Sequence, residues 1–95
     1  MSLLKRYIIE RDIPGVGSMS ITELCGAARA SNQAIDQLGP DVQWQHSYVA
    51  GEKTFCVYLA KDEAVIRRHE QMSGFPATTI TEVRKMIDPT TERTS

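Results

Sequence analysis

The sequence has 95 residues, the length of one small domain, and its hydrophobic fraction of 41% is ordinary for a globular protein. A net charge of −1 provides no general attraction to phosphate backbones, so we expect no nucleic-acid partner. No apolar run approaches the roughly 18–20 residues of a membrane helix, and the N-terminus lacks the apolar stretch and cleavage site of a signal peptide. We therefore expect a cytoplasmic protein with no membrane partner. Cys25 and Cys56 are too few for a disulfide framework and match no zinc motif, so both should be free thiols.

The first predicted elements are a strand and a helix. Residues 5–11 alternate charged side chains with Tyr and Ile, which is typical of a strand, and the turn at Pro14 ends it. Ser20 and Glu23 have the spacing of a capping box, which predicts a helix that continues to about Leu38. Its expected apolar stripe consists of Ile21, Leu24, Cys25, Ala28, Ile35 and Leu38.

The second half of the chain predicts a hairpin, a helix and a last strand. Residues 42–49 are rich in aromatic and β-branched side chains, and residues 54–60 are apolar enough for a central strand. Asp62 can cap a helix that ends near Ser73, before a glycine. Residues 78–83 form the last predicted strand, with a continuation to Ile87 as an alternative.

The element order β-α-β-β-α-β predicts a ferredoxin-like α+β fold, in which an antiparallel sheet carries both helices on one face. We expect one domain over residues 4–87 and a flexible C-terminal tail over residues 88–95. The other face of the sheet would be bare, and it would expose Trp, Tyr and Ile side chains to water. We therefore predict a homodimer that pairs through this open face.

Two histidines are the main candidates for chemistry. Regular alternation along the strand would place Trp44, His46 and Tyr48 on one face. His46 is then either a half-buried residue bonded to a neighbouring hydroxyl, or a metal ligand or proton carrier. His69 falls on the apolar stripe of the second helix with Val65 and Met72. It is either satisfied by protein partners or faces a ligand in a pocket.

Cys56 and Glu10 complete the candidate set. A regular hairpin pairs Cys56 with Ser47 and turns it away from His46, whereas a bulge near Gly51 would place it opposite His46. Glu10 ends the first strand, where it could lend an oxygen to a divalent ion or lie in water. No catalytic triad or carboxylate pair can be identified from spacing, so the catalytic residues are unknown.

The chain resembles a family of small bacterial proteins of unknown function, some of which are described as nickel-binding or nickel-responsive. The resemblance implies a ferredoxin-like dimer that binds Ni²⁺ or another late first-row ion, and His46, Cys56 and His69 match recurring polar positions of the family. Imidazole suits copper and zinc as well as nickel, so Cu²⁺ and Zn²⁺ stay as alternatives. The resemblance is carried by residues 7–12 and the following Pro-Gly turn, 44–49, 51–58, 63–67, His69 and 74–77.

Three functions follow from these observations. The first is a dimeric metal-binding protein that uses His46 and His69, with Cys56 or Glu10 as further ligands. The second is a small-molecule-binding protein or enzyme of the dimeric ferredoxin-like barrel type, with a histidine in its pocket. The third is an accessory interaction domain without chemistry of its own.

Overall fold

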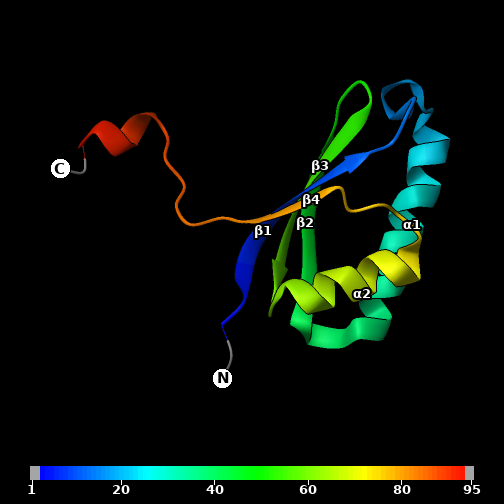
Figure 1. Ribbon diagram of the computed structural model, residues 1–95. Coiled ribbons are helices and arrows are strands. Elements are labelled where there is room, and N and C mark those ends of the chain that lie inside the picture. The colour runs from blue at the N-terminus through cyan, green and yellow to red at the C-terminus, as the bar shows by residue number, and fades with distance from the viewer. Residues whose placement is uncertain (1–2, 94–95) are drawn as a thin grey trace.

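The computed structural model describes residues 3–93, which form a four-stranded antiparallel sheet with both helices on one face (Figure 1). The strand order is β2-β3-β1-β4, so β3 and β1 are the two inner strands and β2 and β4 are the edges. This arrangement confirms the predicted ferredoxin-like α+β fold. The elements are β1 (Lys5–Asp12), α1 (Ile21–Leu38), β2 (Val42–Val49), β3 (Lys53–Ala60), α2 (Glu63–Ser73) and β4 (Thr79–Glu82).

The helices begin and end where their capping residues predict. The Ser20 hydroxyl accepts the backbone N–H of Glu23 at 3.1 Å, and the Glu23 carboxylate accepts the backbone N–H of Ser20 at 3.2 Å. Asp62 caps α2 by accepting the backbone N–H of Val65 at 3.0 Å. Gly74 ends α2 with a φ of 82°, a left-handed conformation that favours glycine.

The core lies between the sheet and the helices, and it differs from the predicted stripes at three positions. In α1 the buried residues are Ser31 and Ala34, so the side of the helix that packs against the core is centred near Ser31. Cys25, which was predicted on the apolar stripe, is exposed to solvent. Ile21, in the first turn, is 81% exposed, and Met72 of α2 is 43% exposed. The core cluster contains Tyr7, Ile9, Val42, Cys56, Tyr58, Ala60, Val65 and Ile66.

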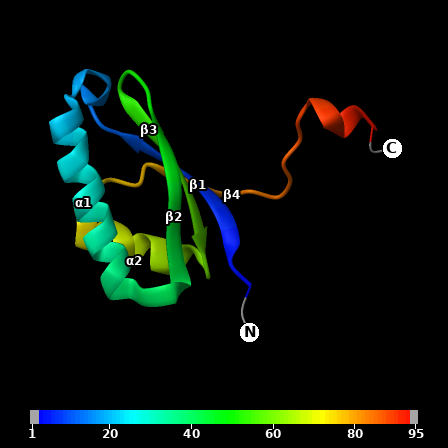
Figure 2. The same ribbon diagram turned by 180° about the vertical axis from the view of Figure 1, so that it is seen from behind.

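The C-terminal segment runs away from the body of the domain (Figure 2). Strand β4 ends at Glu82, so the predicted continuation to Ile87 is wrong. Met86 and Ile87 are both more than 70% exposed on this extended segment, and a short 3-10 turn follows at Pro89–Arg93. The domain limit at residue 87 and the flexibility of the tail stay predictions, and residues 94–95 of that tail lie outside the described residues.

Candidate functional site

A bulge in β2 decides which way its side chains face. Trp44 pairs with Tyr58 and His46 pairs with Val57, so Gln45 is an extra residue in the strand. Trp44 therefore faces the helices while His46 faces the open side of the sheet. The prediction that Trp44 and His46 share a face is wrong, because the strand does not alternate regularly at this point.

Cys56 adopts the first of its two predicted registers. It pairs with Ser47 and faces the helices, away from His46. Its side chain is buried, and its sulfur accepts a hydrogen bond from Arg11 Nε at 3.4 Å and lies 3.6 Å from Thr54 Oγ1. The thiol is therefore held among polar groups on the helix side of the sheet.

The four predicted metal ligands do not meet within one chain. His46 and Glu10 lie on the open face, whereas His69 and Cys56 lie on the helix side. On the open face, β3 separates β2 from β1, so these two strands are roughly 10 Å apart. Glu10 instead lies 3.5 Å from the ammonium group of Lys53. Within residues 3–93 no three His, Cys, Asp or Glu side chains form a group that could hold a metal ion.

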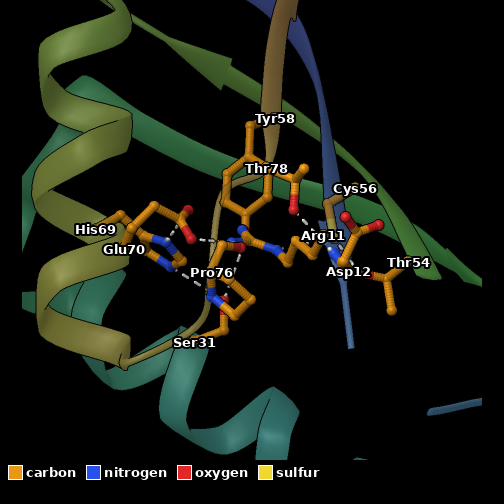
Figure 3. Close-up of polar contacts among 10 residues, drawn as sticks. All are labelled: Arg11, Asp12, Ser31, Thr54, Cys56, Tyr58, His69, Glu70, Pro76 and Thr78. Atoms are coloured by element: carbon orange, nitrogen blue, oxygen red, sulfur yellow. Dashed lines mark hydrogen bonds and ion pairs between the residues drawn. The ribbon is translucent and has the colours of Figure 1, made fainter. Parts of the chain in front are cut away.

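His69 belongs to a closed ring of hydrogen bonds formed by five side chains (Figure 3). Arg11 Nη2 lies 3.4 Å from the Tyr58 hydroxyl, which lies 3.2 Å from Ser31 Oγ. Ser31 Oγ lies 3.1 Å from Nε2 of His69, and Nδ1 of His69 lies 3.4 Å from Glu70 Oε1. The other oxygen of Glu70 forms an ion pair with Arg11, which closes the ring.

The chemistry of these groups fixes the direction of every bond in the ring. An ionised carboxylate can only accept, so Nδ1 of His69 carries a proton and donates it to Glu70. Nε2 must then accept from the Ser31 hydroxyl, which in turn accepts from Tyr58. Tyr58 accepts from the guanidinium of Arg11, which can only donate. All five side chains therefore have compatible roles at once.

Burial keeps His69 uncharged at neutral pH. Removal from water and, to a smaller extent, the positive charge of Arg11 lower the pKa of His69 to about 4, while a contact with the backbone of Ser31 acts in the opposite direction. Burial also raises the pKa of Tyr58. Since both ring nitrogens of His69 have protein partners and the side chain is fully buried, this imidazole could bind a metal only if the ring opened.

The ring contains residues that we did not predict from the sequence. Arg11 falls on the same side of β1 as Tyr7 and Ile9, which are core residues, and its own exposure is only 2%. An arginine at an inward position of a strand implies a buried acidic partner. That partner is Glu70, which follows the predicted His69 directly. The alternation of inward and outward side chains along β1 is the sequence signal that could have identified Arg11 as a buried residue.

A cavity of about 500 Å³ lies beside the ring, between α1 and the β2–β3 hairpin. Arg11, Ser31 and Tyr58 form its polar end, and neither histidine lines it. His69 lies behind Ser31 and Tyr58 instead. The apolar walls include Ile13, Val16, Met19, Leu24, Trp44 and Phe75.

A second hollow, of about 490 Å³, lies on the open face and contains His46. The imidazole is exposed and meets the ring of Tyr48 edge to face, with the ring centres 5.2 Å apart. Arg6 and Lys85 add positive charge to this hollow. Its apolar lining consists of Ile8, Val57, Val83 and Met86.

Comparisons with known proteins identify the family. Residues 7–83 match the family model described as nickel responsive protein SCO4226-like. The chain belongs to this family. A crystal structure of SCO4226 from Streptomyces coelicolor A3(2) superposes with a TM-score of 0.67 and 22% sequence identity, and the match covers 86% of this chain and 99% of that one. At this identity the likeness shows the fold alone.

Two further findings concern the curated proteins and the helices. Among curated proteins the chain has no significant match. Within residues 3–93, neither helix combines the length and the apolar character that crossing a membrane requires.

Proposed function

We propose that this protein is a homodimer that binds Ni²⁺, or another late first-row divalent ion, between the open faces of two sheets. His46 of each subunit is the principal ligand. The observation that carries this proposal is the exposed imidazole of His46 in the hollow of the open face, since imidazole nitrogen is a preferred ligand of nickel, copper and zinc. The name of the family, nickel responsive, supports nickel among these ions.

The apolar character of the open face supports the dimer. Ile8 lies on it and is only half-buried, Tyr48 is 62% exposed, and the exposed Met86 of the C-terminal segment lines the same hollow. A second copy that pairs face to face would remove these side chains from water. In a twofold dimer the same surface meets itself, so a residue near the axis lies close to its own copy. In the proposed dimer this residue is His46.

A single subunit would offer the ion one imidazole among positive charges. Arg6 and Lys85 line the same hollow as His46, and their positive charges lower the affinity of a single chain for a divalent cation. A second imidazole and a carboxylate from Glu10 would offset this repulsion, with water in the remaining positions. His69 and Cys56 are left out of the proposed ligand set, because they lie on the helix side and His69 has no free ring nitrogen.

Equilibrium dialysis of untagged protein against Ni²⁺, combined with sedimentation analysis, tests this function. We expect about one ion per two chains in the wild type and a dimer that the ion strengthens. His46→Ala should lose the ion, Glu10→Gln should weaken binding, and Lys85→Gln should tighten it. Binding should fall at acidic pH, because the ligands must be deprotonated.

His69→Gln is the matched control, since it removes the other histidine of the chain without changing the open face. It should keep the metal stoichiometry of the wild type. Unchanged binding in His46→Ala would refute the ligand assignment. A wild-type protein that binds none of Ni²⁺, Cu²⁺ and Zn²⁺ would favour an accessory interaction domain instead.

A further inference from the structure

The cavity between α1 and the hairpin is a half-open pocket of about 500 Å³ that is lined by small side chains at its base. Ile13, Met19 and Leu24 surround the space without filling it. Both walls carry small residues: Ala27, Ala28 and Ser31 on α1, and Ser47, Thr54 and Cys56 on the sheet.

We propose that this cavity binds an uncharged, largely apolar small molecule that carries one acceptor oxygen, such as a carbonyl. The size fits, since the volume lies within the range of about 300–1,000 Å³ that is usual for ligand sites. The volume of the cavity is also roughly three times the volume of an engineered cavity of ~150 Å³ that binds one benzene molecule. A molecule with two fused rings and a short substituent would occupy it.

Two hydroxyl groups indicate the acceptor oxygen. Ser47 Oγ accepts a hydrogen bond from Trp44 Nε1 at 2.9 Å, and Thr54 Oγ1 accepts one from the thiol of Cys56 at 3.6 Å. Among the residues that the structure describes, neither hydroxyl donates a hydrogen bond in return. Both face the cavity. A hydroxyl hydrogen that has no protein acceptor can bind an oxygen of the ligand.

The charge balance of the polar end excludes an anion. Arg11 is the charged side chain among the lining residues, and its guanidinium is already neutralised by the carboxylate of Glu70. A carboxylate ligand would have to leave water and compete with Glu70 for this single cation. An uncharged oxygen carries no such cost, so the cavity should select neutral molecules over acids of the same shape.

Three naphthalene derivatives of matched shape test this selectivity. 2-Acetylnaphthalene is neutral and has the carbonyl, 2-isopropenylnaphthalene has the same shape without oxygen, and 2-naphthoate has the same shape with a negative charge. Trp44 is the single tryptophan of the chain and lies in the wall, so its indole N–H signal in ¹H–¹⁵N spectra reports occupancy directly. We expect 2-acetylnaphthalene to bind in a 1:1 ratio, and the other two to bind about fivefold to tenfold more weakly.

Substitutions locate the binding site. Ala28→Leu fills the cavity from α1, so it should weaken binding of 2-acetylnaphthalene at least tenfold, and Ala27→Leu should do the same. Ala64→Leu adds the same side chain to an exposed position of α2 and should leave the affinity unchanged. In the wild type, a nuclear Overhauser contact should join the acetyl methyl of the ligand to the methyl of Ala28. This last measurement does not depend on whether a variant folds.

Several outcomes would overturn the proposal. Equal affinity for all three compounds would indicate unspecific apolar binding, and tighter binding of 2-naphthoate would identify an anion site. The absence of the contact with Ala28 would place the ligand elsewhere. If no compound binds and Ala28→Leu changes the oligomeric state, the cavity is an interface between copies. The metal proposal survives each of these results, because His46 lies on the opposite face of the sheet.

Discussion

Glu70→Gln should be among the most destabilising isosteric changes in this protein. The side chains of Arg11 and Glu70 are only 3% and 9% exposed, so their ion pair is buried. Removal of the negative charge leaves the guanidinium of Arg11 buried without a counter-charge, which costs about 3–5 kcal/mol. A domain of this size has a free energy of unfolding of about 5–15 kcal/mol, so the loss is a large fraction of the total.

Urea unfolding followed by the fluorescence of Trp44 measures this loss. With a slope of about 2 kcal/mol per molar urea, the midpoint should fall by about 2 M. Glu63→Gln is the control: Glu63 also pairs with an arginine, Arg67 at 3.0 Å, but both side chains are more than half exposed, so the change should cost less than about 1 kcal/mol.

A double variant separates the buried charge from the shape of the site. Arg11→Met combined with Glu70→Leu removes both charges, so no buried ion is left without its partner. The loss in the free energy of unfolding should therefore be clearly smaller than the sum of the losses in the two single variants. The carbonyl of Pro76, which accepts from Arg11 at 2.9 Å, would still lose its donor. A loss below about 1 kcal/mol in Glu70→Gln, or additive costs in the double variant, would refute the buried ring.

Three further predictions concern acid stability, two glycines and the thiols. The pKa of His69 is about 4 in the folded protein and near 6.5 in the unfolded chain, so the unfolded chain binds a proton at a higher pH. The free energy of unfolding should therefore fall by up to about 3 kcal/mol as the pH drops from about 6.5 to about 4. His69→Phe should lose this part of the pH dependence in urea titrations, and an unchanged profile would contradict it. Gly17→Ala should destabilise by about 1–3 kcal/mol, because a Cβ atom would lie 2.9 Å from the carbonyl oxygen of Gly51. Gly26→Ala should instead stabilise the protein by about 0.5–1 kcal/mol, because Gly26 lies in a helix and no atom is within 4 Å of its Cβ position. Equal shifts of the melting temperature in the two glycine variants would contradict both predictions. A thiol reagent should modify exposed Cys25 rapidly and buried Cys56 only on unfolding, whereas two fast thiols per chain would contradict the burial of Cys56.

The fold was predictable because each local signal agrees with the global arrangement. The capping residues Ser20 and Asp62 fix where the helices begin, and Gly74 fixes where α2 ends. Apart from the alternative continuation of the last strand, the predicted strands differ from the observed ones by no more than one residue at either end. The main failure is the continuation to Ile87, where apolar residues follow β4 without a neighbouring strand to pair with.

The candidate site was less predictable because it depends on a register shift and on long-range contacts. The bulge at Gln45 reverses the face of His46 relative to Trp44, and no turn residue marks it in the sequence. Arg11 and Glu70 are 59 positions apart, so only the fold brings them together. His69 was recognised as an inward residue from helical spacing, but its partners Ser31 and Tyr58 come from other elements.

A crystal structure of the untagged protein grown with Ni²⁺, with anomalous data collected at the nickel absorption edge, tests the proposed function most directly. We predict an anomalous peak between two sheets that face each other, within about 2–2.5 Å of the ring nitrogens of two copies of His46. A peak beside Cys56 or His69, or sheets that do not face each other around the ion, would contradict the proposed site.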